Sequence, residues 1–120
     1  MTKVLVVEDN TNARAAIVDY LQRLGYHVES AATGSEAIDL GMEFQPEFLI
    51  CDWILDGPCD GIGVTEKLLS SDQRPEVIFI TAMPLSDLFC RCGHLDVKAF
   101  LAKPIDLKRL GSLVKAAQPK

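Results

Sequence analysis

The chain has 120 residues, the usual size of one domain, and we expect a single domain over residues 1–120. Its net charge of −5 disfavours direct nucleic-acid binding by this domain, because such binding draws its affinity from Lys and Arg on phosphates. No apolar run approaches the roughly 20 residues of a membrane span, and the run after Lys3 is too short for a signal-peptide core. We therefore expect a cytoplasmic protein that does not contact membranes.

Five short runs predict β-strands. Four of them are almost entirely apolar and rich in β-branched residues, which is typical of parallel strands covered on both faces. These four runs are residues 3–7, 48–51, 77–80 and 99–102. The fifth run, residues 27–31, is more polar and suits the edge of a sheet. The sequence therefore predicts a mostly buried sheet with one exposed edge strand.

The segments between these runs carry helical spacings of apolar residues. Gly25 is expected to stop the first helix and Pro46 to end the second. Thr33 and Glu36 form a candidate capping box, and Asp60 is the expected cap of a third helix over residues 61–71. A fourth helix is expected from about Pro84 and a fifth from about Ile105 or Asp106. The apolar residues that share one face of the first two helices are Ile17, Leu21 and Leu24, then Ala37, Ile38, Gly41 and Phe44, and the fourth helix carries Leu85, Leu88, Phe89 and Cys92. Val64 and Leu68 of the third helix are expected to point inward, and Leu107, Leu110 and Val114 of the fifth to face the core.

Five successive strand–helix pairs predict an α/β fold, in which helices cover both faces of a parallel sheet. Right-handed crossovers leave few topologies for such a chain. The small five-stranded solution known from doubly wound folds is the flavodoxin-like (βα)5 three-layer sandwich, with strand order 2-1-3-4-5.

Polar residues stand where the predicted strands end. They are Glu8 and Asp9 after the first strand, Asp52 after the third, Thr81 after the fourth and Lys103 after the fifth. Functional groups of open parallel sheets gather beyond the carboxyl ends of the strands, and strands one and three are neighbours in the expected order. We therefore expect the three carboxylates over one crevice, with the hydroxyl and the ammonium group on its other side.

Three carboxylates in one crevice repel each other, and one like-charged pair at about 4 Å costs on the order of a few kcal/mol near a protein surface. Lys103 offsets one negative charge, and a divalent cation would offset two more. Mg²⁺ prefers carboxylate oxygens and keeps several of its waters. The cluster therefore predicts a Mg²⁺ site with an open position for a phosphate oxygen, and Mn²⁺ is a further candidate.

Four motifs in order resemble the receiver domain of two-component response regulators, over essentially the whole chain. They are Glu8-Asp9-Asn10, the isolated Asp52, Ile80-Thr81-Ala82, and Phe100-Leu101-Ala102-Lys103-Pro104. The resemblance implies that Asp52 accepts a phosphoryl group from a histidine kinase or a histidine phosphotransfer protein. It also implies that the domain is a switch, and that it is an enzyme only toward its own phosphorylation and dephosphorylation.

The resemblance further assigns roles around Asp52. Asp9, Asp52 and the backbone carbonyl of Ile54 would hold Mg²⁺ directly, and Glu8 would act on it mostly through water. Lys103 would pair first with Asp52 and then with the phosphoryl oxygens. Phosphoryl transfer depends mainly on positioning and charge neutralisation, which a metal ion and a lysine supply together.

A second set of implied roles concerns signalling. Thr81 and the neighbouring Ala82 would bind the phosphoryl group, and Phe100 would pack inward into the space that Thr81 leaves. The fourth helix, fifth strand and fifth helix would then form the output surface, which acts on an attached effector domain or a downstream protein. Dimerisation on phosphorylation stays open.

Several alternatives stay open beside this interpretation. The chain could be a pseudo-receiver, an interaction module that takes no phosphate. Residues 53–60 form a loop that is one residue longer than the family pattern and lacks its usual Met-Pro pair. Phe100 could be an ordinary core residue, and Thr81 a hydroxyl bonded to backbone. An aspartate-nucleophile phosphatase is disfavoured because Ile54 stands where that class needs a second acid.

The four cysteines are expected to stay reduced in the cytosol. They are Cys51, Cys59, Cys90 and Cys92. Cys90 and Cys92 supply at best half of a zinc site, and buried or inert thiols are the alternative.

Overall fold

The computed structural model describes residues 2–52, 61–70, 75–81, 98–103 and 105–116. The predicted fourth helix lies outside these residues, as do the expected cap at Asp60 and the loop over residues 53–60. No helix within the described ranges is long and apolar enough to cross a membrane.

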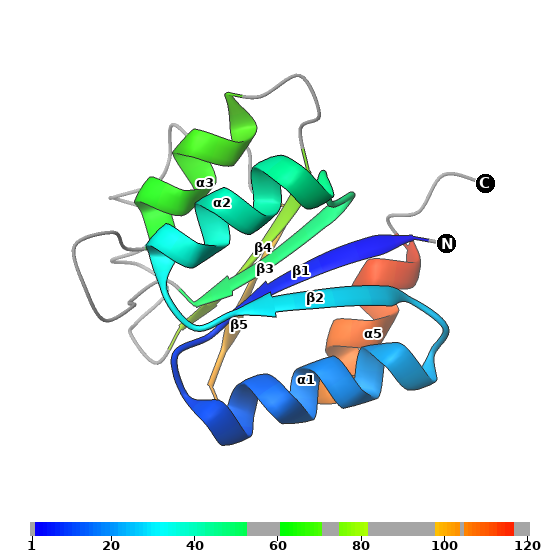
Figure 1. The fold of residues 1–120 in the computed structure, drawn as a ribbon. Coiled ribbons are helices and arrows are strands. Elements are labelled where there is room, and N and C mark those ends of the chain that lie inside the picture. The colour runs from blue at the N-terminus through cyan, green and yellow to red at the C-terminus, as the bar shows by residue number, and fades with distance from the viewer. Residues whose placement is uncertain (1, 53–60, 71–74, 82–97, 104, 117–120) are drawn as a thin grey trace.

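Five parallel strands form one sheet in the order β2-β1-β3-β4-β5. They are β1 (Lys3–Val7), β2 (His27–Ala31), β3 (Phe48–Asp52), β4 (Glu76–Thr81) and β5 (Ala99–Ala102). The predicted order is confirmed, and the more polar β2 lies at an edge (Figure 1). At their carboxyl ends, β3 and β4 each extend one residue beyond the predicted runs, so Asp52 and Thr81 are themselves paired with neighbouring strands.

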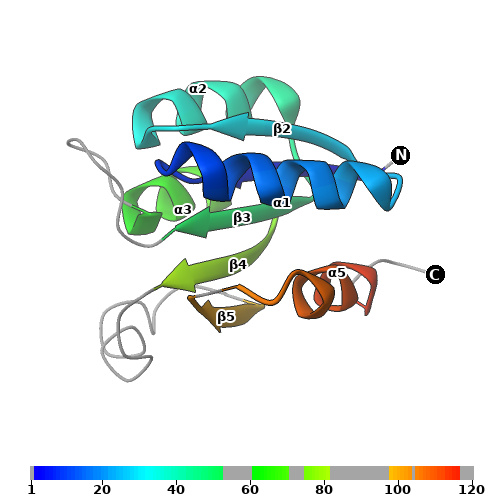
Figure 2. The same ribbon diagram turned by 90° about the horizontal axis from the view of Figure 1, so that it is seen from below.

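Helices cover both faces of the sheet. They are α1 (Thr11–Arg23), α2 (Gly34–Phe44), α3 (Gly61–Leu69) and α5 (Leu107–Ala116). Figures 1 and 2 show α2 and α3 on one face and α1 and α5 on the other, which gives the three predicted layers. The third helix was predicted to reach Ser71 but ends at Leu69, where the Ser70 hydroxyl donates a hydrogen bond to the Lys67 carbonyl (2.7 Å). Serine side chains that bond nearby backbone in this way favour helix ends over helix interiors.

Alternating side chains of the strands build two cores. The core under α2 and α3 includes Leu5, Val7, Leu49, Cys51, Val77 and Phe79, together with Ala37, Val64 and Leu68. The core under α1 and α5 includes Val4, Val6, Ile50, Ile78 and Ile80, together with Ile17, Leu21, Leu110 and Val114. Burial of a strand on both faces produces the continuous apolar runs from which the strands were predicted.

The apolar face predicted for the first helix does not extend to Leu24. Leu24 shares the helical spacing of Ile17 and Leu21, but its side chain is 49% exposed. The reason is that α1 ends at Arg23, so Leu24 is the residue that follows the helix, and Gly25 then turns the chain with a φ of +97°. The stop at Gly25 is confirmed, because glycine adopts this left-handed conformation without a steric penalty.

The capping box of the second helix is confirmed in its first half. The Thr33 hydroxyl accepts a hydrogen bond from the Glu36 amide at 3.2 Å. The Glu36 carboxylate reaches back to the Ala32 amide, also at 3.2 Å, instead of to the amide of Thr33. Both contacts satisfy amide groups at a helix start, which would otherwise lack partners.

Candidate functional site

The residues predicted at the strand ends meet at the carboxyl edge of the sheet. Glu8, Asp52 and Thr81 are 1%, 5% and 1% exposed. They lie on the adjacent strands β1, β3 and β4 or directly after them, and Lys103 follows β5. The structure therefore brings together the carboxylates, the hydroxyl residue and the lysine that the strand order was expected to unite.

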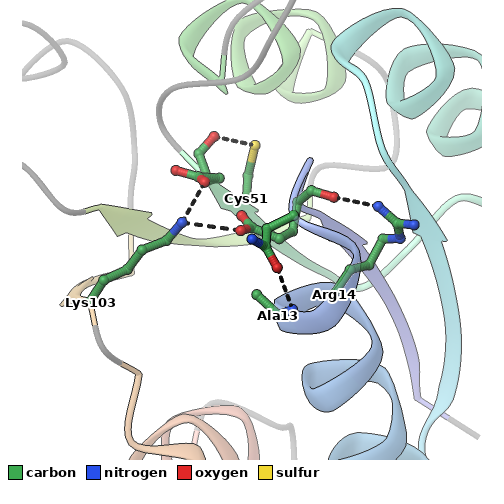
Figure 3. Close-up of polar contacts among 7 residues, drawn as sticks. Ala13, Arg14, Cys51 and Lys103 are labelled. Carbon is green, nitrogen blue, oxygen red and sulfur yellow. Dashed lines mark hydrogen bonds and ion pairs between the residues drawn. The ribbon is translucent and has the colours of Figure 1, made fainter.

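Lys103 links the two buried carboxylates. Its Nζ lies 2.7 Å from Asp52 Oδ2 and 3.1 Å from Glu8 Oε1, as the dashed lines in Figure 3 show. The Lys103 backbone amide donates to the Thr81 carbonyl at 2.8 Å, which fixes the chain just before its side chain reaches across the edge. Lys103 is therefore part of the cluster and not an isolated surface lysine, because it joins two buried carboxylates.

Burial and the shared Lys103 cation together set the pKa values of the cluster. Burial, the hydrogen bond with Asp52 and the charge of Asp52 raise the pKa of Glu8 from 4.5 to about 7, although Lys103 opposes the shift. Burial lowers the pKa of Lys103, but hydrogen bonds and charges of Asp52 and Glu8 outweigh burial and leave it above its ordinary value. Lys103 is thus held as a cation, and one cation does not balance both carboxylates.

The turn after β1 is held from three sides. The Glu8 amide donates to the Ala31 carbonyl of β2 at 3.1 Å. The Glu8 carbonyl accepts a hydrogen bond from Arg14 Nη1 at 2.8 Å, a partly buried contact visible in Figure 3. Asn10 caps α1, with its side chain accepting from the Ala13 amide at 2.9 Å. These contacts position the backbone that carries Glu8 and Asp9.

Arg14 was missed in the sequence. It lies one turn inside a helix, where an isolated arginine is ordinarily a surface residue. The only signal in the sequence is that Arg14 follows the acidic pair Glu8-Asp9 by a few residues. Whether its side chain reaches the Glu8 carbonyl depends on how the intervening turn folds.

The carboxylates are close enough to share a metal ion. Glu8, Asp9 and Asp52 each offer an oxygen, and these oxygens lie within 4.8 Å of one another. Glu8 Oε2 is buried and finds no hydrogen-bond donor among the described residues. A buried carboxylate oxygen without a partner is costly, and an oxygen-preferring divalent cation such as Mg²⁺ would satisfy it. The residues present therefore fit the predicted metal.

The remaining predicted residues are only partly covered by the structure. Ile54 and Ala82 lie outside the described residues. Phe100 is partly buried, and its ring stacks on Phe79 with centroids 6.1 Å apart, beside the core under α2 and α3. This position suits an ordinary core residue as well as a switch, so the switch role stays a prediction. Of the four cysteines, only Cys51 is described; it is buried, and its Sγ lies 3.3 Å from the Asp52 carbonyl oxygen.

Comparison with known proteins gives the family. The family model of the response regulator receiver domain matches residues 4–115. The chain is 27% identical over 117 residues to sporulation initiation phosphotransferase F of Bacillus subtilis, covering 98% of this chain and 94% of that protein. It is 32% identical over 116 residues to the probable transcriptional regulator ycf27 of Guillardia theta, covering 95% of this chain and 44% of that protein. The chain thus spans about half the length of such regulators.

Solved structures agree in fold. The receiver domain of sensor histidine kinase PA1611 from Pseudomonas aeruginosa, which has a magnesium ion in its active-site cleft, is 26% identical with a TM-score of 0.85. That match covers 96% of this chain and 95% of the solved one. Chemotaxis protein CheY4 from Vibrio cholerae has a TM-score of 0.89 at 22% identity, over 98% and 99% of the two chains, which supports the fold alone. The chain belongs to the response regulator receiver domain family of two-component signalling.

Proposed function

We propose that this domain is a phosphorylatable receiver and that Asp52 accepts the phosphoryl group. The donor is the phosphohistidine of a histidine kinase or a histidine phosphotransfer protein. The observation that carries this proposal is the position of Lys103 Nζ, 2.7 Å from Asp52 Oδ2, inside a cluster that also contains Glu8 and Asp9. If Asp52 were only a turn or helix-cap residue, nothing would explain why it is buried and paired with a lysine that follows a different strand.

The acidic cluster would hold Mg²⁺, with Mn²⁺ as an alternative ion. Asp9, Asp52 and the backbone carbonyl of Ile54 are the proposed direct ligands, and Glu8 acts mostly through water. When bound, the ion supplies positive charge to the oxygens of the transferred phosphoryl group. The uncompensated negative charge of the cluster and the unpartnered Glu8 Oε2 support this assignment.

The proposed step moves one phosphoryl group. An Asp52 carboxylate oxygen forms a bond to phosphorus while the phosphorus–nitrogen bond of the donor breaks, and the imidazole leaves with that electron pair. Lys103 gives up its contact with the Asp52 carboxylate and pairs with a phosphoryl oxygen. The hydrogen bonds and charges of Asp52 and Glu8 raise the pKa of Lys103 and keep it positively charged before the transfer. Pre-positioned positive charge of this kind is often the largest contribution to such reactions.

The output is proposed to follow from Thr81. Thr81 and Ala82 bind the phosphoryl group, Phe100 moves inward, and the surface of the fourth helix, β5 and α5 changes. That surface would control an attached output domain or a downstream protein. The relatives of about twice this length are described as transcriptional regulators, which supports an output of this kind.

The pseudo-receiver is the second candidate, because the loop over residues 53–60 departs from the family pattern. Trp53 adjoins Asp52 and is the only tryptophan in the sequence, so its fluorescence can separate the two candidates. We expect the signal to change with Mg²⁺ and again with beryllofluoride, which mimics a phosphoryl group on Asp52.

Asp52→Asn should lose the beryllofluoride response, whereas Asp39→Asn, which changes an exposed acid on α2, should keep it. A silent wild type, or equal responses in wild type and Asp52→Asn, would support the pseudo-receiver instead.

A further inference from the structure

Charge is distributed unevenly along this chain. Residues 98–120 contain six Lys or Arg and one acidic residue, a net charge of +5, whereas residues 1–97 carry −10. Helix α5 holds three of these cations, Lys108, Arg109 and Lys115, and no acidic residue. Strong charge asymmetry within one domain suggests an interaction with a partner of opposite charge. Helix α5 is therefore a candidate docking surface for an acidic partner.

A groove runs between the end of α1 and α5, which lie on the same face of the sheet (Figure 2). Its volume is about 640 Å³. Tyr20, Leu24, Tyr26 and Gly111 supply its apolar lining, and Lys108 and Lys115 supply its charge. We call it the α1–α5 groove.

Gly111 lets the two helices approach closely in this groove. A Cβ atom at this position would lie 3.0 Å from both Leu24 Cδ1 and Tyr20 Cε2. Leu24 and Tyr20 therefore pack directly against the α5 backbone at Gly111. The α1–α5 groove is thus formed by residues of two elements, whereas an exposed lysine pair on a convex helix would form no groove.

Leu24 is the apolar feature of this surface. It is 49% exposed, and among the described residues only one other large apolar side chain, Met42 on α2, is comparably exposed at 48%. Lys108 and Lys115 are exposed and form no ion pair with the described residues. The one acidic residue of α1, Asp19, is paired with Arg23 at 3.0 Å. The groove thus presents an apolar floor beside two cations that pair with no acid in the described part of the chain.

We propose that the α1–α5 groove docks an acidic amphipathic segment of a partner protein. A large apolar side chain of the segment contacts Leu24 and Tyr20, and its carboxylates face Lys108 and Lys115. Helices that bind in grooves present such anchors at intervals of three and four residues. A protein partner is favoured over nucleic acid or an anionic membrane, because the net charge of −10 on residues 1–97 repels an extended polyanion. The chain's own last four residues, Ala117 to Lys120, contain no acid and do not supply this chemistry.

The test uses the full chain and a fluorescein-labelled synthetic helix of about 14 residues, with Glu on one face and Leu and Phe anchors on the other. Binding is followed by fluorescence anisotropy. We expect Lys108→Glu/Lys115→Glu to weaken binding at least about tenfold, because two attractions become repulsions. We expect Leu24→Asn to weaken it about fivefold through lost apolar contact.

Each variant has a matched control. Lys67→Glu/Lys98→Glu makes the same change of net charge at exposed lysines of α3 and of the segment before β5. Met42→Asn likewise replaces a large apolar side chain with an amide, at 48% exposure against 49% for Leu24, on the opposite face of the sheet. Both controls should bind as wild type does, and circular dichroism verifies that every variant is folded.

The proposal is overturned if wild type does not bind the acidic helix, if a Gln-for-Glu helix binds equally well, or if the controls weaken binding as much as the groove variants. Tighter binding of an oligothymidylate or of phosphatidylserine vesicles would assign the cations to nucleic acid or membrane. Self-association that disappears in Lys108→Glu/Lys115→Glu would assign the groove to a second copy of the chain. Because none of these measurements needs Asp52, failure here leaves the proposed phosphorylation untouched.

Discussion

The two ends of the sheet hold their charges in different ways. At the carboxyl end, Glu8 and Asp52 are almost fully buried and share the ammonium group of Lys103. At the amino end, Lys3 is exposed: its amide approaches Glu47 Oε1 at 3.4 Å, and its Nζ approaches the Phe44 carbonyl at 3.4 Å. Exposed charges contribute little to stability, whereas buried ones are costly without full compensation. The proposed phosphorylation accounts for charges that are costly to keep at the carboxyl end, and four substitutions test this contrast between the two ends.

Removal of the shared cation should have the largest effect. We expect Lys103→Met to slow phosphorylation by acetyl phosphate about 100-fold, because a positioned charge that meets the transferring group is lost. The rate is measured by intact mass over time at saturating Mg²⁺. Lys98→Met changes an exposed lysine just before β5, at the amino end of the sheet, and should leave the rate near that of wild type. A Lys103→Met rate within about threefold of wild type would remove this lysine from the mechanism.

The buried acid Glu8 should make stability depend on pH. Its pKa is about 7 in the folded chain against 4.5 ordinarily. Between these values the unfolded chain is ionised while the folded chain keeps the proton, so the free energy of unfolding falls as pH rises from 4.5 to about 7. Glu8→Gln removes this penalty and should stabilise the metal-free protein above pH 7 by on the order of 2 kcal/mol.

Urea unfolding at about pH 5 and about pH 8, without divalent ions, measures this difference. Glu43→Gln, at an exposed position of α2, is the control and should change neither value. If Glu8→Gln and wild type keep the same difference in unfolding free energy at both pH values, Glu8 does not bear the expected penalty.

Arg14 should affect the site through the backbone. It donates to the Glu8 carbonyl at 2.8 Å and so holds the turn that carries Glu8 and Asp9. We expect Arg14→Met to weaken Mg²⁺ binding about tenfold, as loss of an outer-shell partner commonly does. Arg14→Lys, which keeps a donor and its charge, should recover part of the affinity.

A Mg²⁺ titration followed by Trp53 fluorescence measures this effect. Arg23→Met is the matched control, since Arg23 lies on the same helix and pairs with exposed Asp19. An unchanged Mg²⁺ affinity in Arg14→Met would show that the turn keeps its shape without this hydrogen bond.

The smallest effect is expected at the amino end of the sheet. Lys3 lies over the Phe44 ring with its Nζ 5.5 Å from the centroid. Lys3→Met should lower the free energy of unfolding by no more than about 0.5 kcal/mol, because the contact is exposed. Phosphorylation and Mg²⁺ affinity should not change. A clearly larger loss of unfolding free energy, or slower phosphorylation, in Lys3→Met would contradict the difference between the two ends.

Most of the fold could be predicted from the sequence, because strands covered on both faces require continuous apolar runs and short connections limit their order. The site could be predicted for a related reason. Glu8, Asp52, Thr81 and Lys103 each stand at a strand end, and parallel strands end at one edge. Both the residue types and their positions at strand ends can be read directly from the sequence.

The rest depends on distances that only folding sets. The burial of Glu8, its sharing of Lys103 with Asp52 and the contact of Arg14 with the Glu8 carbonyl join residues through packing, and no local pattern encodes them. Leu24 shows that a local pattern can also mislead. Its spacing matches the core face of α1, but the helix ends one residue earlier and leaves it half exposed.

The central claim is that Asp52 takes a phosphoryl group, and intact-mass analysis after incubation with acetyl phosphate and Mg²⁺ tests it most directly. Wild type and Asp39→Asn should each gain the mass of one phosphoryl group. Asp52→Asn should gain none, and chelation of Mg²⁺ should prevent the gain in wild type. No gain in wild type, or an equal gain in Asp52→Asn, would contradict the proposed phosphorylation of Asp52.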